Sequence, residues 1–231
     1  MLFELGWSRP CLMGCTGFAV VCALVCTSDG NAQTRPTPTE ECRFAYDGFA
    51  TSPVDKIEIG EVTERGAVQL EVCGSAKGCV EAPVAQGTPI QIYRRQGAWT
   101  CGYVSGHNGA GPAWVASDAL RIVPHNEHPS PSAWVGIWSG GEDRVSIRLA
   151  DKAGALHLTG SAVWHGAYTS HLGDTRGIAS PIGNRLHFVE NGPGSCTINL
   201  VLLNRYILAE DNQACGGPNA RFQGIWKRTS P

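Results

Sequence analysis

The sequence is poor in several features that mark common protein classes. Only 16% of its 231 residues are charged, whereas about 25% is average for a soluble protein. The net charge is −2 with mixed signs, which indicates neither a nucleic-acid partner nor an acidic tail. Helical spacing of apolar residues is also missing over any useful length, which argues against a helical fold.

Familiar catalytic signatures are missing as well. The sequence has no Gly-x-Ser-x-Gly, no phosphate-binding Gly-Lys loop, no His-Glu-x-x-His and no Cys-x-x-Cys. We therefore predict a protein that is not an enzyme and that needs no cofactor. A hydrolase with a carboxylate pair between two modules stays open as an alternative, because distances in space are not visible in a sequence.

The N-terminus has the composition of an export signal. Residues 11–26, CLMGCTGFAVVCALVC, are apolar and uncharged, and the small residues Gly30 and Ala32 suit a cleavage after residue 32. We predict that residues 1–32 are a signal peptide and that the mature protein is periplasmic or extracellular, with no membrane span. A membrane anchor is the alternative, but the run is short for one. A lipid-anchored form is another, but Val25 stands where a small residue is favoured.

Cysteine is plentiful, and its distribution indicates disulfides. Of ten cysteines, six remain after removal of the predicted signal peptide: Cys42, Cys73, Cys79, Cys101, Cys196 and Cys215. An even number in an exported chain is typical of a disulfide framework. Four of the six lie before residue 102 and two lie after residue 195. Among the first four we prefer the pairs Cys42–Cys101 and Cys73–Cys79, although four cysteines allow three pairings. The last two would form Cys196–Cys215. The spacing does not fit a zinc knuckle, so we expect no metal site.

Two polar, proline-rich segments divide the chain. They are residues 33–40, QTRPTPTE, and residues 124–133, PHNEHPSPSA. We predict two modules, 41–123 and 134–229. Both contain short runs of alternating apolar and polar residues bounded by Gly, Pro and Asn, so we expect both to be all-β.

The first module resembles a bacterial SH3-type domain over residues 70–123. The pieces QGTPIQIY (86–93), QGAWTCGYV (96–104) and AWVASDALRIV (113–123) follow one another in the family's order. The cysteines and Ala113, where the family has Gly, depart from the pattern. The resemblance implies a small barrel that contacts peptides, often those of the cell wall.

The aromatic residues of this module are its candidate ligand-binding residues. Trp99, Tyr103 and Trp114 would form a platform for an extended ligand, with His107 in the neighbouring GHNGAG loop. The competing interpretation, which we favour for Trp99 and Trp114, is that these side chains belong to the core. For His107 the competing interpretation is a polar turn residue.

The second module contains eight strand-like runs. They lie near residues 134–138, 143–150, 155–165, 174–180, 185–190, 195–203, 206–211 and 221–228. Their connections are mostly short, which predicts antiparallel neighbours. Eight such strands without a helix favour an up-and-down barrel, because closure removes the exposed sheet edges.

A repeated Gly-Ile-Trp triplet marks both ends of this module, at 136–138 and 224–226. We predict that the first and last strands pair and close the barrel. The glycines would allow close approach, the two tryptophans would cap one end, and Arg228 or Lys227 would stack on Trp138. The residues assigned to barrel closure are Gly136, Trp138, Gly224, Trp226 and Arg228.

The second module resembles calycin-type barrels, the lipocalins and avidins, whose first strand carries Gly-x-Trp. It is similar also to a domain of uncharacterised exported bacterial proteins that opens with Trp-x-Gly-x-Trp, here 134–138. That domain ends in Asp-Asn-x-x-Cys-Gly-Gly-x-Asn, here 211–219, followed by Phe-x-Gly, here 222–224. We expect Asp211 and Asn212 to hold a turn through bonds to the backbone. A ligand contact or a catalytic pair is the alternative.

Alternation divides the barrel strands into two faces. The apolar face would be the core, and the polar face, which includes His157, His165 and His187, would contact water. A zinc site formed by these three histidines is the alternative to a solvated face, and we predict the solvated face.

The predicted function is that of an exported binding protein. Its SH3-like module would contact peptidoglycan peptides or an extracytoplasmic protein, and its barrel would bind a ligand or a protein. The alternative is an inhibitor of a secreted hydrolase, such as a lysozyme or a protease, because rigid loops suit that role.

Overall fold

The computed structural model describes residue 42 and residues 57–63, 68–75, 78–104, 111–190, 192 and 195–230, with only the backbone described for 68–75, 78–83 and 111. The predicted signal peptide and first linker lie outside these residues. The described elements are strands and two short 3-10 helices, η2 (Ser117–Ala119) and η3 (Pro131–Trp134). The all-β prediction is therefore confirmed. Among the described residues, no helix has the length and hydropathy needed to span a bilayer.

The N-terminal sheet has seven antiparallel strands in the order β3-β2-β6-β5-β4-β1-β7. Apolar side chains on one of its faces form a small core around Ile90, Val104 and Val115. Strand β1 precedes the segment on which the SH3 resemblance rests, yet it lies between β4 and β7. The strand bounds are β1 (Glu58–Val62), β2 (Val68–Ser75), β3 (Gly78–Val84), β4 (Pro89–Gln96), β5 (Trp99–Val104), β6 (Gly111–Ala116) and β7 (Leu120–Ile122).

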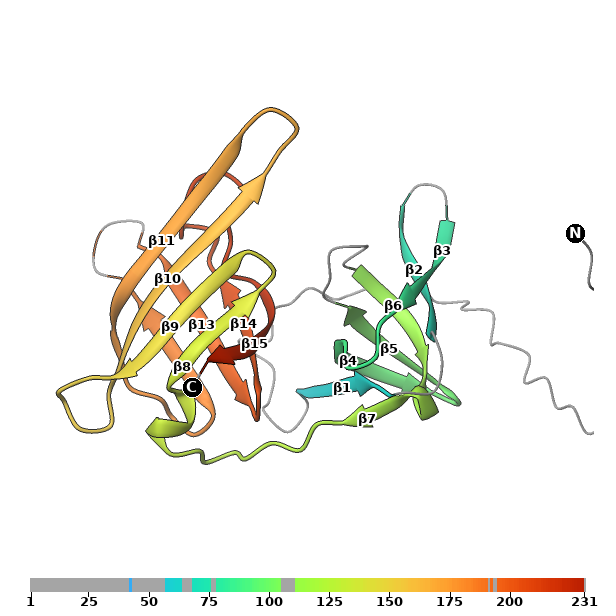
Figure 1. The fold of residues 1–231 in the computed structure, drawn as a ribbon, viewed down its shortest axis with the longest axis horizontal. Helices are drawn as coiled ribbons and strands as arrows, with labels where there is room; N and C mark the ends of the chain where they lie inside the picture. The colour runs from blue at the N-terminus through green and yellow to red at the C-terminus, as the bar shows by residue number, and fades with distance from the viewer. Residues whose placement is uncertain are drawn as a thin grey trace, which may run out of the picture. The chain divides into compact units, whose positions relative to one another are not determined.

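The C-terminal strands form an eight-stranded, nearly closed antiparallel barrel (Figure 1). Their order is β11-β10-β9-β8-β15-β14-β13-β12, so the first and last strands pair as predicted. The bounds are β8 (Gly136–Gly140), β9 (Asp143–Leu149), β10 (Leu156–His165), β11 (Ser170–Ala179), β12 (Arg185–Val189), β13 (Thr197–Leu203), β14 (Tyr206–Asp211) and β15 (Gly224–Ser230).

The barrel differs from the expected closed form at one seam. Strands β11 and β12 follow each other in the chain but are the two ends of the sheet order. At Gly177 of β11, a Cβ atom would lie 2.4 Å from the ring of Phe188 on β12. The Phe188 ring therefore packs directly on the β11 backbone, and side-chain packing takes the place of a ladder of hydrogen bonds there.

Alternation along the barrel strands produces the predicted inner and outer faces. The inward positions carry large side chains that are fully buried, including Trp138, Phe188 and Trp226. Trp134 of η3 and Phe222, which precedes β15, are buried in the same core. Ser161, His165 and His187 on the polar face are exposed. Burial of this apolar set, at about 25 cal/mol per Å², is the main favourable term for a fold of this kind.

The outer surface of β13, β14 and β15 is apolar, unlike the rest of the barrel. Val201, Leu208 and Ile225 point outward and are nevertheless buried. They pack in one cluster with Ile59 of β1 and with Ile57, the residue before β1. Two sheets that the sequence separates by a linker thus share an apolar cluster.

A buried carboxylate lies beside this shared cluster. Glu61 of β1 is 3% exposed. Its carboxylate accepts hydrogen bonds from Arg205 Nε at 2.8 Å, Tyr206 Oη at 2.6 Å and Arg121 Nη2 at 2.7 Å. Burial alone would raise the pKa of Glu61, but these hydrogen bonds outweigh it and lower the pKa to about 2. Burial and the bond to Glu61 raise the pKa of Tyr206 to about 12.

We predict that Glu61 makes the fold sensitive to acid. Its pKa is lowered on folding, so its contribution to stability is complete above about pH 4.5 and is lost as the pH falls towards about 2. The contribution corresponds to about 3 kcal/mol. Glu61→Gln should therefore lower the free energy of unfolding at pH 7 and flatten its decrease between pH 4.5 and 2, as measured by urea denaturation.

Glu58→Gln is the matched control on the same strand. Glu58 forms a more exposed ion pair with Arg95 at 2.5 Å, and such pairs contribute about 1 kcal/mol or less. If both variants changed the acid transition equally, the assignment to Glu61 would be wrong.

Candidate functional site

The aromatic residues predicted to bind a ligand lie on one face of the N-terminal sheet. Trp99, Cys101 and Tyr103 are every second residue of β5, so their side chains lie on the same face. Cys101 is the cross-strand partner of Trp114 on β6. Trp114 is only 5% exposed and packs against the Cys42–Cys101 disulfide, with the Arg94 guanidinium 5.2 Å from its ring centroid. Trp114 is thus a core residue, whereas Trp99 and Tyr103 are half-buried.

The N-terminal sheet contains the first preferred disulfide. Cys42 and Cys101 are bonded, with their Cα atoms 5.6 Å apart. Cys73 and Cys79 are directly opposite each other in the ladder between β2 and β3. The side chains of Cys73 and Cys79 are not among those that the structure describes, so the structure does not test their proposed disulfide. The predicted site residue His107 lies outside the described residues.

Of the residues assigned to barrel closure, Gly136, Trp138 and Arg228 meet where β8 pairs with β15. The Arg228 guanidinium lies 4.4 Å from the Trp138 ring centroid and donates a hydrogen bond to Ala133 O. Burial lowers the pKa of Arg228. At Gly136 a Cβ atom would be 2.6 Å from the backbone oxygen of Ser230. The expected close approach therefore occurs here.

Two details of the predicted closure differ from the structure. Around Gly224 there is open space, and its φ of +113° is what favours glycine. Trp226 packs against Gly140 of β8. Trp138 lies two residues before Gly140 on the same strand, where it is the cross-strand partner of Arg228. The two tryptophans therefore fill successive levels of the core and do not cap one end together.

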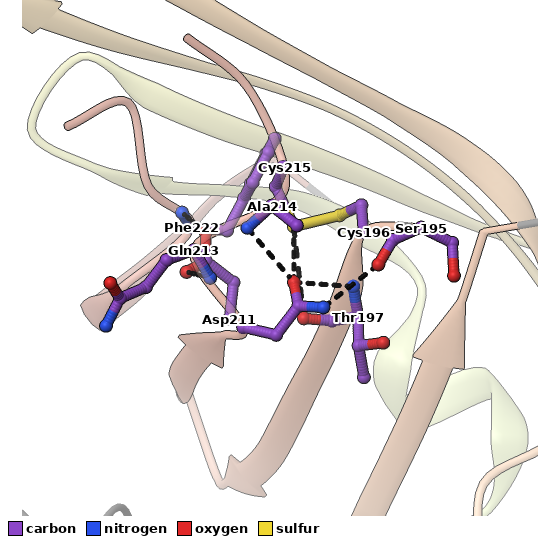
Figure 2. Close-up of a disulfide and its surroundings, with 9 residues drawn as sticks. Ser195, Cys196, Thr197, Asp211, Gln213, Ala214, Cys215 and Phe222 are labelled. Atoms are coloured by element: carbon purple, nitrogen blue, oxygen red, sulfur yellow. Dashed lines mark hydrogen bonds between the residues drawn. A yellow bond between two sulfur atoms is a disulfide. The ribbon is translucent and has the colours of Figure 1, made fainter. Parts of the chain in front are cut away.

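The segment 211–222 forms a braced loop at one end of the barrel (Figure 2). Cys215 is bonded to Cys196, the residue before β13, with Cα atoms 4.4 Å apart. Asn212 Oδ1 accepts hydrogen bonds from Thr197 N at 3.1 Å and Ala214 N at 3.2 Å. The loop is therefore fixed by a covalent bond and by one amide side chain.

Asp211 completes the bracing of this loop. One carboxylate oxygen accepts a hydrogen bond from Gln213 N at 2.9 Å, and the other accepts one from Phe222 N at 2.7 Å (Figure 2). Both ends of the loop are thus tied to the same side chain. This is the turn-holding geometry expected for Asp211 and Asn212.

The braced loop packs against the free edge of β11. Gly217 N donates a hydrogen bond to Leu172 O at 3.0 Å, and His171 Nδ1 donates one to Pro218 O. A Cβ atom on Gly173 would lie 2.4 Å from Cys215 O, so only glycine permits this approach. The Cys-Gly-Gly-Pro-Asn motif therefore covers part of the barrel edge that β12 leaves unpaired.

The hairpin of β10 and β11 projects beyond the neighbouring strands at this end (Figure 1). At its tip Tyr168 is fully exposed, and Leu172 is 65% exposed. Behind the tip, the rings of Trp164 and His171 stack with centroids 5.1 Å apart. Sequence reasoning missed this tip, because a lone tyrosine in a turn carries no pattern of its own.

The hairpin tip is braced from a second side by His165. Its Nδ1 lies 2.7 Å from Ser170 Oγ, and its Nε2 lies 2.6 Å from Glu142 Oε2 in the turn between β8 and β9. The connectivity is that of a serine, histidine and acid array. However, the His165 and Glu142 side chains are 57% and 58% exposed. In the described structure, the array links two hairpins at the surface.

Among the described residues, Asp143 is the carboxyl group whose pKa is raised furthest towards neutral pH. It lies on the inward face at the start of β9 and accepts a hydrogen bond from Val163 N at 2.9 Å. Burial raises the pKa of Asp143 to about 6, and the nearby carboxylates of Glu142 and Asp211 add to this. Such perturbed groups cluster at functional sites, and this one lies beside the braced loop and the projecting hairpin.

The three histidines considered for zinc do not converge. His165 is held by Glu142 and Ser170, while His187 Nδ1 donates to Asn199 Oδ1 at 2.7 Å on another part of the barrel. His157 lies opposite Arg148 and Ile178. In the part of the chain that the structure describes, no three potential metal ligands lie together.

Comparison with known proteins yields no relative. No protein-family model matches the sequence, and neither a curated protein nor a solved structure matches it significantly.

We predict that Asp143 destabilises the fold at neutral pH. Its pKa is raised on folding, so its contribution is most favourable below about pH 3.8 and is lost as the pH rises through about 6. Asp143→Asn keeps an acceptor for Val163 N and should raise the free energy of unfolding at pH 7 by up to about 3 kcal/mol. The gain should vanish below about pH 4 in urea denaturation. Asp174→Asn, an exposed control, should have little effect, and a gain independent of pH would contradict the assignment.

Proposed function

We propose that this chain is an exported, non-enzymatic binding protein whose barrel docks onto a protein partner through the tip of the β10–β11 hairpin. In this proposal the N-terminal sheet is of SH3 type and the barrel is of calycin type. Two disulfides support an oxidising, exported location. The observation that carries the proposal is a projecting hairpin with a fully exposed Tyr168.

A rigid aromatic tip is well suited to protein recognition. Tyrosine provides a large contact area at a low cost in conformational entropy, and it is enriched among the residues that dominate binding energy. Here the tip is held by His165 on one side and by His171 on the other, through Glu142 and Pro218. Because this bracing exists before binding, little ordering is needed when a partner docks.

The interior of the barrel favours surface binding over a buried ligand. The inward positions are occupied by large side chains such as Trp138, Phe188 and Trp226, each fully buried. Calycin-type ligand binding would require space at these positions. We therefore assign recognition to the loop end and the outer surface of the barrel.

The alternative is that the partner is a secreted hydrolase and that the hairpin inhibits it. A narrow, convex and braced hairpin has the shape needed to enter an active-site cleft. The specific observation in favour is again Tyr168, which stands clear of its own molecule.

The docking role is tested with Tyr168→Ala. The oxidised protein would be titrated into secreted lysozymes and proteases, and both binding and residual enzyme activity would be measured. We expect the variant to weaken the interaction at least tenfold, or by about 1.4 kcal/mol. Ile182→Ala is the matched control, since Ile182 is 85% exposed but lies outside the hairpin. Equal behaviour of the two variants would refute the hairpin as the docking element.

The N-terminal sheet makes a separate prediction. If Trp99 and Tyr103 contact wall peptides, the protein should sediment with insoluble peptidoglycan, and Trp99→Ala should weaken sedimentation about tenfold. Tyr168→Ala should sediment like the wild type. A protein that stays in the supernatant would exclude wall binding by this sheet.

A further inference from the structure

The outer surface of β9, β10 and β11 has a distinct composition, and we call it the arginine face. Its residues lie in three cross-strand rows defined by the ladders of this sheet. The rows are Arg148–His157–Ile178, Ser146–Thr159–Arg176 and Arg144–Ser161–Asp174. All nine side chains point away from the core, because the residues between them are the inward ones.

The arginine face is more basic than the protein as a whole. Arg144, Arg148 and Arg176 are exposed, and Asp174 is the only carboxylate among the nine residues. The face therefore carries a formal charge of 3 − 1 = +2, whereas the chain carries −2. None of the three arginines forms an ion pair within the described residues, so their guanidinium groups remain available to a ligand.

The arrangement of the three arginines matches an extended anionic chain. Strands are about 4.8 Å apart, and same-face residues along a strand are about 6.8 Å apart. Arg144 and Arg148 are thus separated by about 14 Å on β9, and Arg176 faces the gap between them from two strands away. Each guanidinium can bind a carboxylate or a phosphate with two parallel hydrogen bonds.

The groups between the arginines narrow the class of ligand. Ser146, Thr159 and Ser161 supply hydroxyl groups that both donate and accept hydrogen bonds, which suits the hydroxyl groups of a sugar chain. A surface that enters a lipid bilayer instead carries apolar side chains among its basic ones. Here the only apolar residue of the three rows, Ile178, lies on the last strand of the sheet.

We propose that the arginine face binds an anionic polysaccharide. The carboxylate or phosphate groups of the polymer would contact Arg144, Arg148 and Arg176, and its hydroxyl groups would contact the serine and threonine side chains between them. This site is separate from the hairpin tip and does not depend on the proposed docking function.

The proposal is tested by affinity electrophoresis of the full oxidised chain in gels containing polygalacturonate, a linear polymer of uronic acids. Wild-type protein should be retarded, and neutral dextran should have no effect. The triple variant Arg144→Gln, Arg148→Gln and Arg176→Gln should reduce affinity at least tenfold, since each charged contact contributes severalfold. Added salt should weaken wild-type binding, because the contacts are between exposed charges.

Lys227→Gln is the matched control. Lys227 is an exposed cation on β15, outside the three rows, so its removal should leave binding unchanged. Single variants at Arg148 and Arg176 keep the test valid if the triple variant unfolds, which circular dichroism would reveal. Tyr168→Ala should bind polygalacturonate like the wild type. A failure of the docking proposal can therefore be distinguished from a failure of the polysaccharide proposal.

Three results would overturn the proposal. They are the absence of retardation by polygalacturonate, equal retardation of the arginine variants and Lys227→Gln, or tighter binding to vesicles containing phosphatidylglycerol than to the polymer. The last result would assign the face to lipid headgroups.

Discussion

The pairing of β8 with β15 is the constraint on which the barrel depends. It joins the two ends of one segment and so converts a meander into a nearly closed barrel. The pairing needs a glycine at position 136, where any side chain would meet the backbone of β15. Arg228 stabilises it, because its guanidinium stacks on the Trp138 ring and donates a hydrogen bond to Ala133 O. A cation in that position, with an aromatic ring on one side and a carbonyl on another, holds the strand ends together.

The seam that stays open between β11 and β12 explains why the loop end is so heavily braced. A barrel with an open seam leaves backbone groups of β11 without ladder partners, and such edges are prone to association. The Cys196–Cys215 loop places Gly217 against that edge, and Asp211 and Asn212 hold the loop in shape. The same loop also ties the projecting hairpin, through Leu172 and His171. One set of contacts therefore covers the open edge and fixes the hairpin on which the proposed docking depends.

Much of the fold follows from short-range patterns in the sequence. Alternation identified most of the inner face, and the repeated Gly-Ile-Trp triplet identified the strands that pair. Alternation was wrong for Leu149, which is 57% exposed at the end of β9, and for the outer face of β13, where Val201 is buried. Other features depend on contacts between distant segments and left weaker signals. The runs Leu200–Leu203 and Tyr206–Ala209 are apolar at every position, which indicates burial on both faces, yet nothing local identifies β1 as the partner. The hydrogen bonds that Glu61 accepts and the raised pKa of Asp143 likewise arise only when distant strands meet.

The shared apolar cluster changes how the protein can be divided. Val201, Leu208 and Ile225 lie outside the barrel wall and are covered by Ile57 and Ile59. A division of the chain at the proline-rich segment 124–133 therefore separates residues that pack in one apolar cluster. A recombined or expressed fragment that began at this segment would expose the apolar side chains on the outer surface of β13, β14 and β15 to water.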